Sequence, residues 1–283
     1  MALRSWSSLL LMVSMPSVAL GQTQRTMESS RPHRGERALS ARLELFQGRF
    51  EIRPAGGDTL YATRFSYDPE RSRPTGGYDR AAGTLVTGLL PATRTPLLLA
   101  GSSPAQRGLV QLSPEVELRL DAAIAASEAT LELGGLQVAE LTLTSAASIT
   151  NVSFSSPNQT RCRSATIAVE AGDFTLTGFG NSGCVELKLS GGVGRVTLDF
   201  TGAIPDQIEA DLAMTIGELE LVLPRRAGVR VTTGGFLAKF SPAGMTQVGD
   251  GWLSAGYGAS TRKINLKVTS SVGAVTVRWA GDR

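Results

Sequence analysis

The sequence has few of the residues that carry most catalysis and metal binding. Its 283 residues include one histidine, His33, and two cysteines, Cys162 and Cys184. A Ser-His-Asp triad needs a histidine beside its nucleophile, and His33 lies in a polar N-terminal stretch. Two cysteines without a neighbouring histidine make a poor zinc site. We therefore predict no catalytic residue, no metal site and no cofactor.

Charged residues are also scarce, at 19% of the chain, and the formal net charge is only +3. No basic cluster with interleaved aromatic residues stands out, so we predict no nucleic-acid partner. Long amphipathic helical patterns are missing as well. The hydrophobic fraction of 42% is that of a folded chain, and 32 glycines with recurring valine, leucine and threonine favour strands and tight turns.

Long apolar runs are absent too, and the one at the N-terminus is short. Leu9–Val13 follows Arg4 and precedes the small-x-small site Ala19-Leu20-Gly21, which is the pattern of a secretory signal peptide over residues 1–21. The alternative, a membrane anchor, would need about 20 apolar residues. We predict an exported protein, periplasmic or extracellular at the cell surface, with no transmembrane segment after cleavage. Residues 22–40 are polar, and we expect a flexible leader there.

The middle of the chain repeats itself. Five blocks read small, polar, apolar, polar, apolar, and their central positions, 129, 152, 174, 196 and 219, recur at a nearly constant interval. Such alternation is typical of a strand with one buried face. A fixed period of about 22 residues indicates stacked units that bury a face only against a neighbour. We predict an all-β fold, a single-stranded, β-helix-like β-solenoid, with a β-sandwich as the alternative.

The extent of the repeat sets the predicted domains. Residues 123–283 are expected to form the β-solenoid repeat domain, since the block pattern returns near the C-terminus at Gly273–Val277. Residues 41–122 contain strand patterns without the regular period. They are expected to form an N-terminal β cap or a few irregular coils, two options that the pattern does not separate.

Stacking in register would place equivalent residues about 4.8 Å apart on neighbouring strands. Arg195 would then lie between Asp173 and Glu218, a favourable cross-strand arrangement. A catalytic carboxylate cluster is the alternative, but a site grafted onto a repeat would interrupt it, and these residues follow it. The predicted surface ladder consists of Glu128, Asn151, Asp173, Arg195 and Glu218.

The two cysteines fit the same period. Cys162 and Cys184 are separated by one coil length of sequence, so they should occupy the same place on adjacent coils. This puts them within reach of each other, and export would supply an oxidising compartment. We predict a disulfide bond between them. Two buried free thiols are the alternative.

Aromatic residues make up 6% of the chain, and two of them lie in a glycine-rich stretch, residues 249–258. Trp252 and Tyr257 could form an aromatic platform for a sugar or a peptide, because such rings combine an apolar face with a polar tip. A capping cluster is the alternative. The partners we expect are an envelope protein or a cell-surface glycan.

Residues 171–178, 191–200 and 223–231 resemble the bacterial putative-adhesin repeat domain and its toast-rack relatives. The tail, residues 256–277, is similar to the C-terminal domain of LiaF-type cell-envelope stress proteins. The resemblance covers residues 41–279. It implies a bacterial, extracytoplasmic β-solenoid without established catalytic residues.

Together these features predict an exported, non-catalytic interaction or scaffold module of the bacterial cell envelope, similar to an adhesin. One alternative is a sensor or regulatory arm of an envelope-stress system. Another is a polysaccharide-active enzyme on a β-helix, which clustered acids interrupting the repeat would have supported.

Overall fold

The computed structural model describes residues 24–92, 106–235, 240 and 242–281. Within these ranges the chain forms one 18-stranded sheet and a single short 3-10 helix, η1 (Phe179–Ser182). The predicted all-β class is confirmed. The predicted signal peptide, residues 1–21, lies outside the described residues.

Most strands are short near the N-terminus, and several strands further along the chain are much longer. The strands are β1 (Arg25–Pro32), β2 (Ala38–Phe46), β3 (Arg49–Pro54), β4 (Thr59–Tyr67), β5 (Ser72–Asp79), β6 (Thr84–Pro91), β7 (Arg107–Leu112), β8 (Glu117–Ala125), β9 (Glu128–Glu132), β10 (Gln137–Ala146), β11 (Ser148–Ser153), β12 (Cys162–Thr177), β13 (Cys184–Asp199), β14 (Gln207–Leu223), β15 (Gly228–Gly235), β16 (Met245–Val248), β17 (Gly251–Ser254) and β18 (Lys263–Trp279).

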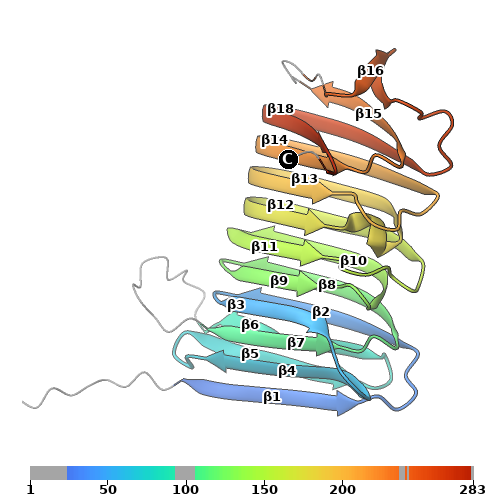
Figure 1. Cartoon of the computed structure of the whole chain (residues 1–283). Helices are drawn as coiled ribbons and strands as arrows, with labels where there is room; N and C mark the ends of the chain where they lie inside the picture. The colour runs from blue at the N-terminus through green and yellow to red at the C-terminus, as the bar shows by residue number, and fades with distance from the viewer. Residues whose placement is uncertain (1–23, 93–105, 236–239, 241, 282–283) are drawn as a thin grey trace, which may run out of the picture.

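The long strands β12, β13, β14 and β18 pair in parallel and stack like the rungs of a ladder (Figure 1). A column of glycines divides each rung at a corner. The first arm consists of the parts of β12, β13, β14 and β18 that precede this corner, together with β6, β2, β8, β10 and β15. The second arm consists of the parts of the same long strands that follow the corner, together with β7, β3, β9 and β11. The corner glycines are Gly172, Gly194, Gly217 and Gly273, which are partners in register.

The corner requires glycine for two physical reasons. Gly194 has φ 141°, a left-handed region that residues with a Cβ atom rarely adopt. A Cβ atom on Gly194 would also lie 1.9 Å from the carbonyl oxygen of Gly172 on the rung before it. Backbone therefore contacts backbone at the corner, and the sheet can bend while its rungs remain hydrogen-bonded.

The core lies where the inward side chains of both arms form one buried cluster. In the first arm, Ile167, Leu189 and Leu212 are partners on successive rungs, and each is at most 3% exposed. In the second arm, Phe174 and Val196 are partners and are buried as completely. The alternation seen in the sequence thus separates a dry inner face from a polar outer face.

The central positions of the sequence blocks are predicted to stack as one inward-facing column, which we call the inner column. One alignment in it, that of Val152 with Phe174, is wrong by two residues. The partner of Phe174 is Thr150, and Val152 pairs with Leu176. Alternation has a period of two, so a shift by two residues leaves every side chain on the same face, and the pattern cannot detect it. Thr150 is buried in place of an apolar residue, and its hydroxyl lies 2.9 Å from that of Ser145.

The N-terminal segment differs from the expected flexible leader, because residues 25–32 form β1. This strand pairs antiparallel with β4, from Arg25 opposite Tyr67 to Pro32 opposite Thr59. Backbone hydrogen bonds to β4 order it, although its side chains are mostly polar, and Glu28 forms an ion pair with Arg64 at 2.8 Å. The prediction of a flexible leader, which was based on polarity alone, is therefore wrong for the residues of β1.

Residues 41–122 contribute two kinds of strand. In the stack, β2 pairs in parallel with β6 and β8, and β3 pairs in parallel with β7 and β9. Beyond these, β5 pairs antiparallel with β6, and β4 pairs antiparallel with β7. Antiparallel strands therefore cap the N-terminal end of the strand stack (Figure 1).

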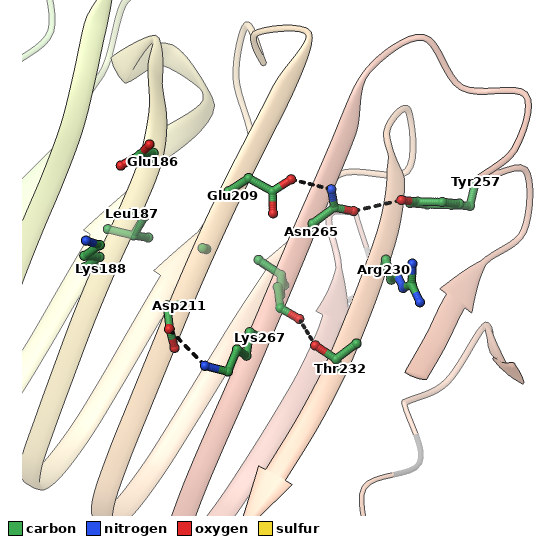
Figure 2. A pocket seen from close by; sticks show the side chains of 12 residues that line it. Glu186, Leu187, Lys188, Glu209, Asp211, Arg230, Thr232, Tyr257, Asn265 and Lys267 are labelled. Carbon is green, nitrogen blue, oxygen red and sulfur yellow. Dashed lines mark hydrogen bonds and ion pairs between the residues drawn. The ribbon is translucent and has the colours of Figure 1, made fainter. Parts of the chain in front are cut away.

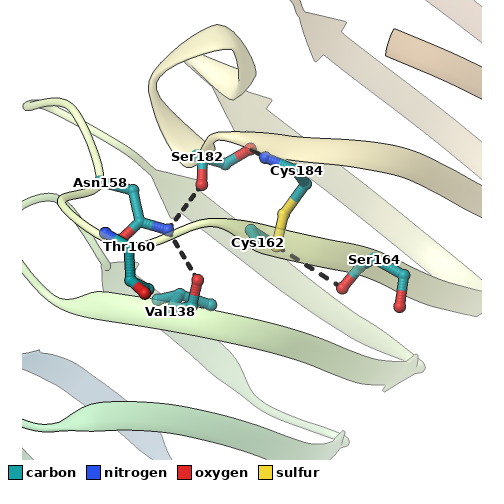
Figure 3. The surroundings of a disulfide bond; sticks show 7 residues. All are labelled: Val138, Asn158, Thr160, Cys162, Ser164, Ser182 and Cys184. Atoms are coloured by element: carbon teal, nitrogen blue, oxygen red, sulfur yellow. Dashed lines mark hydrogen bonds between the residues drawn. A yellow bond between two sulfur atoms is a disulfide. The ribbon is translucent and has the colours of Figure 1, made fainter. Parts of the chain in front are cut away.

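The predicted disulfide bond is confirmed. Cys162 and Cys184 are partners on adjacent parallel rungs, their Cα atoms lie 4.2 Å apart, and both are fully buried (Figure 3). Beside the bond, the side-chain amide of Asn158 donates to the carbonyl oxygens of Val138 and Ser182, at 2.6 Å and 2.7 Å. The disulfide and this amide together connect neighbouring strands of the stack at the start of β12.

Removal of the disulfide in a Cys162→Ala/Cys184→Ala variant should lower the free energy of unfolding by about 3 kcal/mol, because the unfolded chain loses a cross-link that closes a loop of this size. Denaturant titrations of both proteins, with and without reductant, check this. Reductant should destabilise the wild type to the level of the double variant and leave the variant unchanged. Equal stability of the oxidised wild type and the variant would contradict the prediction.

Candidate functional site

A groove of about 600 Å³ crosses the outer face of the first arm. Its floor is formed by four adjacent parallel strands, in the order β13, β14, β18 and β15. Tyr257, in the turn after β17, adds the only aromatic ring among the lining residues (Figure 2). The remaining lining residues lie at positions 186–188, 209–211, 265–267, 230 and 232.

The register of the strands arranges the outward side chains in two rows. Because partners in a parallel sheet lie about 4.8 Å apart, each row presents one polar group for every strand it crosses. The first row runs Glu186, Glu209, Asn265 and Arg230, and the second runs Lys188, Asp211, Lys267 and Thr232.

Hydrogen bonds hold the aromatic end of the groove in place (Figure 2). The hydroxyl of Tyr257 donates to Oδ1 of Asn265 at 2.8 Å. The amide nitrogen of Asn265 donates in turn to Oε1 of Glu209 at 2.6 Å. The ammonium group of Lys263 lies 5.3 Å from the centre of the Tyr257 ring, within the range of a cation–π contact. The ring is therefore positioned before any ligand arrives.

Charges in the groove balance. Lys267 forms an ion pair with Asp211 at 3.2 Å. Glu186, Lys188 and Arg230 have no ion-pair partner within the described ranges. Three cations and three carboxylates line the groove in all, so its formal charge is zero. Such a surface offers hydrogen-bond donors and acceptors to a polar ligand without favouring one sign of charge.

The predicted surface ladder lies on the outer face of the second arm, away from this groove. Asp173, Arg195 and Glu218 are partners as expected. The nitrogen Nε of Arg195 donates to Glu218 at 3.1 Å. This hydrogen bond, followed by the charges of Glu218 and Asp173, raises the pKa of the Arg195 guanidinium. The two members of the Arg195–Glu218 pair are exposed, at 60% and 64%, so their contribution to stability is small.

One member of the predicted ladder, Asn151, does not lie in it. Asn151 pairs with Thr130 and Thr175, and the position between Glu128 and Asp173 belongs to Ile149, which is 53% exposed. The cause is the same two-residue shift that misaligned the inner column. Glu128 does lie in the row, and it accepts a hydrogen bond at 2.7 Å from Arg49, its partner on β3.

The two predicted binding aromatics have different surroundings. Trp252, on β17, is partly buried and packs edge-on against Phe240, with ring centres 6.2 Å apart. Tyr257 lines the groove. The surroundings of Trp252 thus favour the alternative of a packed capping cluster. Of the two rings, only that of Tyr257 is available to a ligand in the groove.

The other groove residues were not among the predicted site residues, although the sequence contains a signal for them. The intervals between positions 186, 209 and 265 equal those between positions 196, 219 and 275 of the inner column. Applying the same spacing to outward positions would have aligned Glu186, Glu209 and Asn265. It would not have placed Arg230 beside Asn265, because β15 pairs with β18 and not with β14, which precedes it in the chain.

Outside the groove, the carboxylate of Glu132 closes the turn after β9. Partial burial opposes its ionisation, but hydrogen bonds outweigh this effect, and the pKa of Glu132 lies below its ordinary value of 4.5. The hydroxyl of Ser153 donates at 2.7 Å, and the hydroxyl of Ser155 and the backbone nitrogen of Gly134 donate at 3.0 Å and 2.6 Å. The ionised carboxylate therefore stabilises the folded chain.

Glu132→Gln should reduce stability at neutral pH and have a smaller effect in acid. A carboxyl whose folded pKa is depressed contributes stability that is present above its unfolded pKa and is lost as the pH falls through the folded value. The stability difference between wild type and variant should accordingly shrink as the pH falls below about 4.5. Denaturant titrations across this range test the prediction, and a difference independent of pH would contradict it.

In the part of the chain that the structure describes, no group of three or more His, Cys, Asp or Glu side chains is placed to hold a metal ion. Nor does any helix of that part have the length and apolar character needed to cross a bilayer.

The stacked, bent parallel strands and the polar groove define an all-β repeat protein with a broad exposed sheet face. The sequence profile of the N-terminal domain of toast_rack, DUF2154, matches residues 19–177, more than half of the chain. The chain belongs to this toast-rack family, and the resemblance stated from the sequence is confirmed. None of the curated proteins compared with the chain matches it.

Several solved structures are similar in outline. A putative cell adhesion protein from Clostridium sporogenes is 14% identical, with a TM-score of 0.47, and the match covers 91% of this chain and 100% of that one. A putative adhesin from Bacteroides fragilis is 8% identical, with a TM-score of 0.41 and coverages of 91% and 99%. A putative lipid binding protein from Parabacteroides distasonis is 10% identical, with a TM-score of 0.32 and coverages of 93% and 96%. Because these TM-scores lie below 0.5, we draw no functional conclusion from them.

Proposed function

We propose that this chain is an exported, non-catalytic interaction module of the bacterial cell envelope, and that it binds a glycan in the groove over β13, β14, β18 and β15. The observation that carries the proposal is the groove itself, with its two polar rows and the fixed ring of Tyr257. In this proposal the rungs form a single-stranded β-solenoid that holds the groove rigidly.

The shape and charge of the groove favour an extended, neutral, polar polymer. Its rows repeat one polar group per strand, which suits a ligand laid across several strands. Sugar hydroxyls both donate and accept hydrogen bonds, so they can satisfy Glu186, Lys188 and Arg230 together. The face of Tyr257 provides an apolar surface for the C–H groups of a sugar ring. A strongly charged ligand would gain little from a groove whose formal charge is zero.

Two observations support export. The bond between Cys162 and Cys184 is of the kind that persists in oxidising compartments. Residues 1–21 have the composition of a secretory signal.

Tyr257→Ala should weaken binding of the full chain to its envelope glycan by about tenfold, since it removes the stacking surface and the hydrogen bond to Asn265. Arg230→Ala should weaken binding to a similar extent. Retention of purified neutral glycans on the immobilised protein measures both effects. Arg163→Ala, which changes an exposed arginine outside the groove, serves as the matched control and should bind as wild type.

Each outcome of this experiment decides something. Equal binding by all variants would show that the glycan binds elsewhere and would refute the proposal that the groove is its site. New reducing ends released over time would show hydrolysis and overturn the non-catalytic assignment. Failure to retain any glycan, together with capture of a specific envelope protein, would favour the sensor or scaffold alternative.

A further inference from the structure

A second hollow, of about 640 Å³, lies at the other end of the molecule, on the outer face of the second arm. Its lining includes three arginines from three adjacent strands: Arg49 of β3, Arg107 of β7 and Arg64 of β4. One carboxylate also lines it, that of Glu51 on β3, and this group forms an ion pair with Arg53 at 3.1 Å. A smaller hollow of about 390 Å³ shares Arg64 and Leu109 with it and extends it towards β1. The groove of the first arm has no such excess of one charge.

The register brings like charges together. Arg49 and Arg107 are direct partners on the parallel strands β3 and β7. Like charges opposite each other destabilise a sheet, and nothing in the backbone requires arginine at either position. On its other side, Arg107 has Ser66 of β4 as its partner. A hydroxyl donor and two guanidinium groups therefore meet at one place on the sheet.

The three arginines differ in their existing partners. Arg49 forms an ion pair with Glu128 at 2.7 Å, and Arg64 forms one with Glu28 at 2.8 Å. All four side chains are at least half exposed, so water screens these pairs and a ligand can share their guanidinium groups. Arg107 is exposed and has no carboxylate partner among residues 24–92, 106–235 and 242–281.

We propose that this hollow binds a phosphate group, with Arg107 as its principal contact. A guanidinium donates two parallel hydrogen bonds to an oxyanion, and Arg49 and Arg64 would donate to the remaining oxygens. The hydroxyl of Ser66 adds a further donor. A carboxylate can pair with a single arginine, as Oε2 of Glu128 does with Arg49. Three arginines around one hollow fit a tetrahedral anion better.

The phosphate group belongs either to a soluble polymer or to a phospholipid head group, and two arms of one experiment separate these sources. In the first arm, the full chain is titrated with inorganic phosphate and with linear polyphosphate at low ionic strength, and calorimetry measures the dissociation constant. In the second arm, the chain is sedimented with phosphatidylglycerol vesicles and with phosphatidylcholine vesicles. Binding in the first arm alone identifies a soluble polyphosphorylated ligand, and added binding to the anionic vesicles identifies the head group.

Arg107→Gln should weaken phosphate binding by about tenfold or more, because it removes the bidentate donor. Arg73→Gln, at an exposed arginine on β5 outside the hollow, is the matched control and should bind as wild type. Tyr257→Ala should also leave phosphate binding intact, which separates this site from the glycan groove. Melting curves confirm that each variant folds. Absence of binding, or an equal loss in Arg107→Gln and Arg73→Gln, would overturn the proposal.

Discussion

Gly194→Ala is expected to destabilise the protein by about 3–5 kcal/mol, although it adds a single methyl group. The added Cβ atom would lie 1.9 Å from the carbonyl oxygen of Gly172, and the residue would have to keep φ at 141°. Both the contact and the conformation involve backbone, so no side-chain rotation can relieve them. Denaturant unfolding of the wild type and the variant measures the difference directly.

The matched control is Gly77→Ala. Gly77 lies on β5, has no positive φ, and a Cβ atom there would meet no atom within 4 Å. This variant should unfold within about 0.5 kcal/mol of the wild type. If Gly194→Ala were as stable as Gly77→Ala, the corner column would not pack as described.

Phe174→Asp is expected to abolish cooperative folding. Phe174 is 1% exposed and contributes one of the largest fully buried side chains of the core. The variant loses the packing of an aromatic ring, at about 3–5 kcal/mol, and buries a carboxyl group without a partner. Their sum is comparable to the whole stability of a typical domain, about 5–15 kcal/mol. Circular dichroism during thermal unfolding should show no cooperative transition.

Thr175→Asp introduces the same charge one residue later, on the outward face, where Asn151 and Thr197 are the cross-strand partners. It should melt within a few degrees of the wild type, because the new carboxylate remains in water. A cooperative, wild-type-like transition for Phe174→Asp would show that this side of β12 is not buried.

The sequence is informative wherever one physical pattern determines one structural feature. Alternation indicates which face of each strand is buried, and the period aligns Asp173 with Arg195 and Glu218. The same period pairs Cys162 with Cys184. These features depend on local polarity and on coil length, both of which can be read from the chain.

Other features depend on relations that local patterns do not contain. The stretch of chain from Thr150 to its partner Phe174 is longer than that from Ala129 to its partner Thr150. A two-residue shift leaves alternation unchanged, so the predicted place of Asn151 is wrong. β1 is ordered by hydrogen bonds to β4, which its own composition does not reveal.

The groove is the clearest case of a tertiary feature. Tyr257 stands out in the sequence for its ring, yet its neighbours Asn265 and Arg230 come from strands whose order, β18 then β15, does not follow the sequence. Chain order places β15 before β18, whereas in the sheet β18 pairs with β14 and β15 lies outside it. Alignment of successive repeats in chain order would therefore not have placed Tyr257, Asn265 and Arg230 side by side.

The central claim is that the groove on the first arm binds the ligand of this toast-rack protein. Hydrogen exchange of the full chain, measured with and without a retained neutral glycan, tests it most directly. Residues 209–211, 228–232 and 263–267 should gain protection, while the surface ladder residues Asp173, Arg195 and Glu218 should remain unchanged. Protection confined to the second arm, or no change in the groove when glycan is bound, would contradict the account.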